Sequence, residues 1–305
     1  MRFFVVLFMA ITFLWGSFEL KLPANAVSVK LDKNDLLIGL DNGDLYNYSI
    51  KTQELNKMID LPKFSNYFDN DIAPKIFSID KLGDVVAILY ESDNGTKSLG
   101  ILENGYLKSF KMPTDGVKKI FLLDSNHVIF VTLSSEVEYY NFKDGKVVFE
   151  NKLTTSSTGD AAYDRKNGVL AIGIEGGVIF YFDTKLKRVV KQVNAQKDTI
   201  YSVGIDGKLL ISGSADKKSY FNNGSKEFYY EAKFLVYCVG ISSDKGAFST
   251  ENSVKIIDKN GEIIKNIEYD GASLNYLIFS NDYLIGSSYD NKIYFWSIKW
   301  IISQA

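Results

Sequence analysis

One pattern of apolar and polar positions recurs along most of the chain. Each copy has an apolar run, then a turn of Gly, Asn, Asp or Ser, then a segment in which large residues alternate with polar ones. The clearest copies are Leu36–Tyr48, Val169–Phe182 and Tyr283–Trp296, and the weaker ones are Val85–Leu102, His127–Tyr140, Leu209–Phe221 and Gly246–Ile257. Two such segments joined by a tight turn are typical of a β-hairpin. The pattern therefore predicts a series of hairpins and a predominantly β protein.

The copies are spaced by about forty residues, which identifies the architecture. One large residue near the end of each alternating segment measures the spacing. These residues are Tyr48, Leu102, Tyr140, Phe182, Phe221, Ile257 and Trp296, at successive intervals of 54, 38, 42, 39, 36 and 39 residues. This is the period of a four-stranded propeller blade, in which the apolar run is the second strand and the alternating segment is the third. Segments such as Ala26–Leu31 and Ile200–Ile205 stand where the innermost strand belongs. We expect an all-β, seven-bladed β-propeller of the WD40 or YVTN type.

Closure of the ring requires an outer strand for the last blade, because an open blade would expose an unpaired edge. Phe18–Leu22 alternates apolar and polar residues, and we predict that it forms this strand. In the alternative, Trp300–Ile302 forms the outer strand and a signal is cleaved after Ala24–Ala26.

The N-terminus has the features of an export signal. Arg2 supplies a positive charge, Phe3–Trp15 is apolar except for Thr12, and small residues follow. The run is short for a membrane span, which needs roughly 20 residues. We predict a signal peptide over residues 1–17 and a propeller over 18–305, exported unfolded to the periplasm without stable membrane insertion after cleavage. The alternative is a retained anchor.

Charge and cysteine content narrow the classes of partner. The chain has 35 Lys and Arg against 37 Asp and Glu, so it lacks the basic excess that neutralises nucleic acid. A single cysteine cannot form an internal disulfide, which is compatible with a periplasmic protein that has a large core. We expect a monomer that binds protein partners and no nucleic acid.

Residues capable of catalysis are sparse. The only histidine, His127, begins an apolar strand, and the only cysteine, Cys238, lies in an apolar segment, so structural roles are favoured for both. Glycines in Gly173–Gly177 and acidic residues in Asp41–Asp44 are interpreted as hairpin turns rather than nucleotide or calcium sites. We predict a protein that is not an enzyme and has no catalytic, metal or cofactor site.

The long first interval indicates an insertion, Leu61–Pro74, between blades one and two. Inter-blade loops are usually short and polar, whereas this one combines aromatic and acidic side chains. As partner-binding residues we predict Phe64, Tyr67, Phe68, Asp69 and Asp71. The alternative is a loop folded back over the propeller rim.

The repeats resemble those of the WD-repeat family in degenerate form. The Gly-His dipeptide of the family is absent, and its Trp-Asp dipeptide survives only as Trp296-Ser297, Phe182-Asp183 and Ile257-Asp258. The resemblance implies a scaffold, since most members of the family bind other proteins. It places no functional residue, because the family's structural Asp-His-Ser-Trp network is missing.

In size, export signal, degenerate repeats and Lys, Asn and Ile content, the chain is also similar to the periplasmic WD-repeat accessory proteins (NapL-like) that some ε-proteobacteria encode with their periplasmic nitrate reductase. That resemblance implies a role in maturing or assisting the enzyme system. Two alternatives stay open. One is a subunit of envelope-assembly machinery, although such propellers favour eight blades. The other is a propeller enzyme, a hydrolase or quinone-dependent dehydrogenase, with its site at the central channel.

Overall fold

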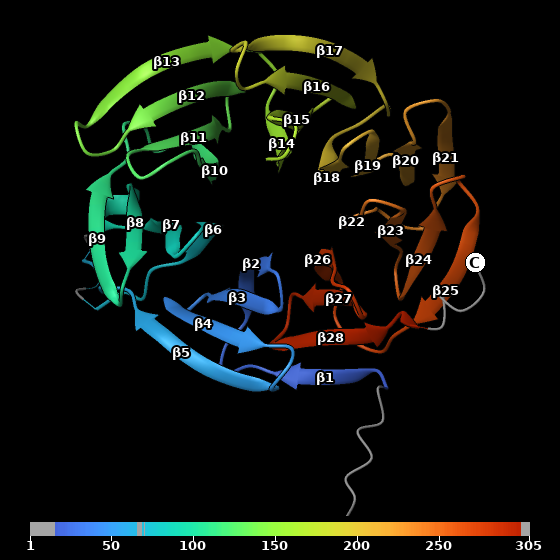
Figure 1. Cartoon of the computed structure of the whole chain (residues 1–305), viewed down its shortest axis with the longest axis horizontal. Helices are drawn as coiled ribbons and strands as arrows, with labels where there is room; N and C mark the ends of the chain where they lie inside the picture. The colour runs from blue at the N-terminus through green and yellow to red at the C-terminus, as the bar shows by residue number, and fades with distance from the viewer. Residues whose placement is uncertain (1–15, 66–68, 70, 300–305) are drawn as a thin grey trace, which may run out of the picture.

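The computed structural model describes residues 16–65, 69 and 71–299. Its strands form seven four-stranded antiparallel sheets that surround a central axis like the blades of a propeller (Figure 1). A short 3-10 helix, η1 (Asp93–Gly95), interrupts the second blade. Within the described ranges, no helix combines the length and apolar character needed to cross a membrane. The predicted fold class, an all-β propeller of seven blades, is therefore confirmed.

Blades one to six each use four consecutive strands, and blade seven combines three C-terminal strands with the N-terminal one. The strands of blades one to three, innermost first, are β2 (Ala26–Asp32), β3 (Asp35–Leu40), β4 (Asp44–Ser49), β5 (Glu54–Asp60); β6 (Ile76–Leu82), β7 (Val85–Glu91), β8 (Lys97–Glu103), β9 (Tyr106–Lys111); β10 (Val117–Leu122), β11 (His127–Thr132), β12 (Glu136–Asn141), β13 (Lys146–Lys152). Those of blades four to seven are β14 (Thr158–Asp164), β15 (Val169–Ile174), β16 (Val178–Asp183), β17 (Arg188–Asn194); β18 (Ile200–Asp206), β19 (Leu209–Ser214), β20 (Lys218–Asn222), β21 (Glu227–Glu231); β22 (Val239–Ile241), β23 (Lys245–Ser249), β24 (Ser253–Asp258), β25 (Ile263–Glu268); β26 (Leu274–Phe279), β27 (Tyr283–Ser288), β28 (Lys292–Ser297), β1 (Phe18–Lys21).

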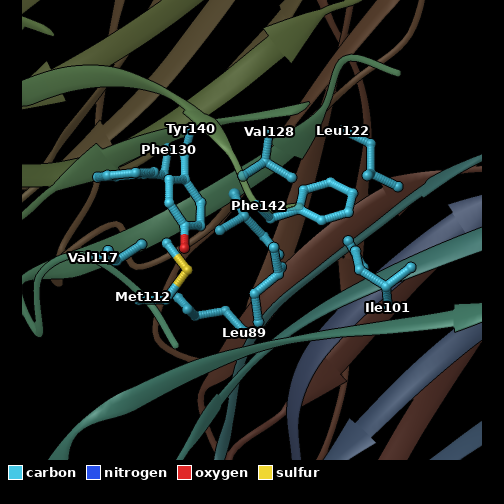
Figure 2. Packing of buried hydrophobic residues seen from close by; sticks show 12 residues of the cluster. Leu89, Ile101, Met112, Val117, Leu122, Val128, Phe130, Tyr140 and Phe142 are labelled. Atoms are coloured by element: carbon cyan, nitrogen blue, oxygen red, sulfur yellow. The ribbon is translucent and has the colours of Figure 1, made fainter. Parts of the chain in front are cut away.

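The second strand of each blade consists mostly of apolar or small residues because it is buried on both faces. In β11 and β15, for example, every residue after the first is buried. The core consequently lies between neighbouring blades. Figure 2 shows the cluster between blades two and three, to which Leu89 of blade two and Phe130 of blade three both belong. The third strands are buried in their middle as well, so that in β12 the four residues Val137–Tyr140 are all buried and only the ends of the strand are partly exposed.

Blade seven is closed by the N-terminal strand. β1 pairs antiparallel with β28, with Phe18 opposite Phe295 and Lys21 opposite Lys292 (Figure 1). The predicted closure by Phe18–Leu22 is therefore confirmed, with Leu22 buried directly after the strand. Trp300–Ile302 and all but the last two residues of the predicted signal, residues 1–17, lie outside the described part of the chain, so the signal stays a prediction.

Side chains on the innermost strands tie successive blades together. The Ser78 hydroxyl accepts a hydrogen bond from the backbone N–H of Ile120 in the next blade (3.3 Å). The Asp160 carboxylate does the same for Val203 (3.1 Å). A third bond of this kind joins Ser202 to the N–H of Val239 (3.2 Å). These acceptors satisfy backbone N–H groups on the inner edges of the blades, which have no further strand to pair with.

Candidate partner-binding face

The meander order gives the propeller two unlike faces. Every blade-to-blade connection and every turn between second and third strands lies where the innermost strands begin, and we call this the entry face. The remaining turns lie on the opposite, exit face. Most connections on the entry face are short, such as residues 112–116 and 153–157, but the connection from β5 to β6 covers residues 61–75. The predicted insertion between blades one and two is thus present.

The base of this inserted loop is ordered by its own contacts. Phe64 and Ile72 form an isolated antiparallel bridge with two backbone hydrogen bonds of 3.0 Å. An ion pair of 2.7 Å joins Lys63 to Asp71. The backbone N–H of Ser65 donates to the Asp93 carboxylate in the β7–β8 connection (3.2 Å). This hydrogen bond joins the inserted loop to another loop of the entry face.

The predicted partner-binding residues divide into three groups. The Phe64 side chain is buried at 7% exposure, so it packs into the base of the loop. Asp69 and Asp71 are exposed, and Asp69 accepts a hydrogen bond from the backbone N–H of Asp71 (3.2 Å). Tyr67 and Phe68 lie outside the described residues. Partner binding by this set stays a prediction.

A cavity of about 760 Å³ runs along the central axis. Its walls are the innermost strands of all seven blades, from β2 to β26 in Figure 1. Cavities that hold ligands in proteins typically measure about 300–1,000 Å³. The channel therefore has the dimensions of a binding site, and the chemistry of its two ends differs.

Three lysines from blades two and three, Lys97, Lys118 and Lys119, line one side of the channel toward the entry face, and we call them the lysine arc. The Lys119 ammonium pairs with Asp160 at 2.8 Å and lies 5.9 Å from the ring of Tyr276 in blade seven. Burial opposes the charge of Lys119, but Asp160 and Tyr276 hold its pKa above the usual value. The Lys97 ammonium donates to the Val117 carbonyl (2.6 Å).

Lys118 differs from the other two lysines of the arc. It is the extra residue of a β-bulge in β10, so its side chain escapes the normal alternation of the strand. Among the described residues, the Lys118 ammonium has no hydrogen bond and no ion pair. Burial lowers the pKa of Lys118, and the nearby Lys119 lowers it further, while Asp160 acts in the opposite direction. The result is a partly desolvated and unpaired positive charge at the channel wall.

Aromatic side chains of blades five to seven lie on the entry face around the same end of the channel, and two of them, Tyr201 and Tyr289, line it. We call Tyr201, Phe234, Tyr237 and Tyr289 the aromatic arc. The ring of Tyr237 lies 5.4 Å from that of Tyr201 and 6.0 Å from that of Phe234. The exposed fractions of Tyr201, Phe234 and Tyr289 are 38%, 36% and 61%. Exposed aromatics grouped in this way mark a surface suited to contact.

The exit end of the channel holds an ion network instead. Asp80 is almost fully buried, at 1% exposure, and its carboxylate receives Lys30 from blade one at 2.8 Å and Arg165 from blade four at 2.5 Å. The same carboxylate accepts the backbone N–H of Leu122 (2.8 Å). Arg165 also donates to the Leu122 carbonyl. This network links four blades and pairs the charges at the exit end. The unpaired charge of Lys118 lies at the entry end.

The other groups with potential reactivity lie at a strand end, in the core and in turns. His127 begins β11, with Nδ1 3.0 Å from the Asp124 carboxylate. Cys238 is fully buried, and burial raises the pKa of its thiol to about 12. Gly176 and Gly177 form the β15–β16 turn with positive φ, and Asp41–Asp44 forms the β3–β4 turn. In the described part of the chain, no three His, Cys, Asp or Glu side chains gather as metal ligands would.

Comparison with known proteins identifies the fold. No protein-family model matches the sequence, and no curated protein matches it significantly. Among solved structures, a chain of a mitotic checkpoint complex aligns with a TM-score of 0.73 and 13% identity, over 92% of this chain and 91% of that one. The β-propeller domain of Cps50 (Swd1) from Myceliophteria thermophila gives 0.71 and 12%, over 90% and 97%. The computationally designed protein Ika8 gives 0.66 and 12%, over 91% and 98%.

The chain is a seven-bladed, WD40-like β-propeller. At these identities the likeness shows the fold alone. The lysine and aromatic arcs of this propeller were not predicted from the sequence. Their strand position is a signal that could have found them, because Lys118 and Tyr201 each stand at the second position of an innermost strand. A β-bulge interrupts the alternation of side chains there, and both residues line the channel.

Proposed function

We propose that this propeller is a non-catalytic scaffold of the periplasm that binds protein partners through its entry face and assists maturation or function of the periplasmic nitrate reductase system. One observation carries the scaffold role: the inserted loop and the exposed aromatic arc lie on the same face, around the same channel. A rigid ring of blades presents such groups without needing reactive side chains.

The similarity to solved structures supports a scaffold. One of the similar chains belongs to a mitotic checkpoint complex, which is an assembly of proteins. The non-catalytic character is supported by the carboxylates in and beside the channel, because Asp160 and Asp80 are each bound to a lysine and to a backbone N–H group. Support for the periplasm comes from the predicted export signal, and support for nitrate reductase from the resemblance described from the sequence.

The test is capture of the exported, full-length chain from periplasm through an affinity tag, followed by identification of the proteins retained. We expect components of the nitrate reductase system among them, and a strain that lacks the protein should reduce nitrate more slowly. Normal maturation and activity of the enzyme in that strain would refute the nitrate reductase role. Absence of any specific partner would refute the scaffold role, and recovery of the chain from cytoplasm alone would refute the assigned compartment.

A further inference from the structure

The entry end of the channel combines two unlike walls. The lysine arc comes from blades two and three and the aromatic arc from blades five to seven, so they face one another across the axis (Figure 1). Between them, Lys119 reaches from blade three toward Tyr276 of blade seven and is neutralised by Asp160. The charge that faces the opening is therefore that of Lys118 and Lys97.

This charge has no directly bound counter-ion among the described residues, although Asp115 and Glu91 attract Lys97 and Asp160 attracts Lys118 from a distance. In the described structure neither Lys97 nor Lys118 forms an ion pair, and only Lys97 has a hydrogen-bond acceptor, the Val117 carbonyl. An ammonium group that is partly removed from water without a partner is unfavourable, and a bound anion offsets that cost. The unpaired charge of Lys118 thus points to a ligand with a negatively charged group.

The aromatic arc indicates that the anion is part of a larger molecule. Tyr289 is 61% exposed, and Leu133, in the β11–β12 turn on the same face, is 47% exposed. A small anion held at Lys118 would leave these side chains in water. A polypeptide that inserts one carboxylate between the arcs would cover them, because aromatic side chains at a rim act as apolar anchors for a protein partner.

We propose that the mouth of the channel binds a carboxylate on an extended segment of a partner protein, with Lys118 as its ionic partner and the aromatic arc as the apolar wall beside it. This inference rests on the scaffold function proposed above and adds the chemistry of the recognised segment. Lys97 strengthens the attraction from the same side, and Lys119 forms the floor of the mouth.

The probe is an array of short synthetic peptides that alternate Phe with Asp, Asn or Lys, made with amidated and with free carboxyl termini. The purified, exported, full-length chain is applied to it. We expect the Asp peptides to be retained and the Asn and Lys peptides to be lost. Retention of Asn peptides only when their terminus is free would identify a terminal carboxylate as the recognised group. Equal retention of amidated Asp and Asn peptides, or no retention at all, would overturn the proposal.

Variants assign the effect to the mouth. Lys118→Met keeps the aliphatic stem but removes the charge, so it should weaken retention of the Asp peptides about tenfold, the loss of one favourable charge contact. Lys118→Arg keeps the charge and should retain these peptides as the parent chain does. Lys259→Met removes an exposed charge from a turn on the exit face and should leave retention of the Asp peptides unchanged. Equal retention by Lys118→Met and Lys259→Met, with unchanged thermal unfolding, would refute the role of Lys118. Capture of periplasmic partners is measured separately, so the scaffold function can stand if this inference fails.

Discussion

The ring of Phe18 lies parallel to the ring of Phe295, with centroids 4.5 Å apart and planes inclined by 5°. These residues come from opposite ends of the propeller sequence and from the two strands that close it. The Phe18 ring also meets the edge of Tyr283 at 5.6 Å. Closure of the ring is therefore stabilised by apolar packing in addition to the β1–β28 ladder.

Replacing Phe18 by Ala should loosen this closure. The substitution removes a stacked, half-buried ring, and we expect a loss of about 1–2 kcal/mol in the free energy of unfolding, measured by urea denaturation. Deleting residues 18–22 should have a larger effect and promote association between molecules, because the β28 edge becomes free to pair. Lys21→Ala, an exposed position of the same strand, is the control. Equal stability of the Phe18→Ala and Lys21→Ala variants would contradict a role for the stack.

The closure strand and the blades could be predicted because their signals are local and repeated. Seven apolar runs followed by alternating segments fix which residues pair. All seven large residues whose spacing gave the repeat length, from Tyr48 to Trp296, lie in third strands. The channel mouth could not be predicted in this way. Lys118 and Tyr289 belong to different blades, and their side chains share one opening only because the ring closes. The burial of Phe64 was also missed, because its bridge partner Ile72 lies across a loop with no regular pattern.

Asp80 should be the most sensitive acidic position of the channel. Asp80→Ala would leave Lys30, Arg165 and the Leu122 N–H without their shared acceptor in a buried site, and we expect a loss of about 3–5 kcal/mol in the free energy of unfolding. The control is Glu231→Ala, which breaks a surface pair with Lys218 at a side chain that is 75% exposed and should cost less than about 1 kcal/mol. Similar losses for the two variants in chemical denaturation would show that the network contributes little.

The two adjacent glycines of the β15–β16 turn should respond differently to Ala. Both have positive φ, at +85° for Gly176 and +79° for Gly177. A Cβ on Gly177 would lie 2.1 Å from the carbonyl oxygen of Gln196, whereas one on Gly176 would meet nothing within 4 Å. We expect a loss of about 1–2 kcal/mol for Gly176→Ala from backbone strain alone, and a clearly larger loss for Gly177→Ala. Matching melting temperatures for the two variants would rule out the steric conflict.

Glu138 should make stability depend on pH. Burial, together with Glu150 and Glu136, raises the pKa of Glu138 from 4.5 to about 7 in the folded protein. Between these values the folded state keeps a proton that the unfolded state has released, so stability falls as pH rises from about 4.5 to about 7. Glu138→Gln should remove this loss. Above pH 7 we expect it to raise the free energy of unfolding by on the order of 1 kcal/mol, after allowance for solvent screening, and below pH 4.5 to change it little. Denaturation across this pH range, with the exposed Glu103→Gln as control, measures it. A gain that is independent of pH would contradict the assignment.

The inserted loop gives the most direct test of partner binding at the entry face. Because the Phe64–Ile72 bridge brings the two ends of the loop together, residues 63–72 can be removed with little change to β5 or β6. We expect the shortened chain to unfold at nearly the parent temperature and to lose capture of its periplasmic partner.

Tyr67→Ser with Phe68→Ser in the intact loop should weaken capture if the aromatic residues are the anchors. The control is Tyr106→Ser, which removes an aromatic residue that is 77% exposed beside an exit-face turn. Capture that survives the deletion would exclude the loop as an anchor and leave the channel mouth as the partner-binding site.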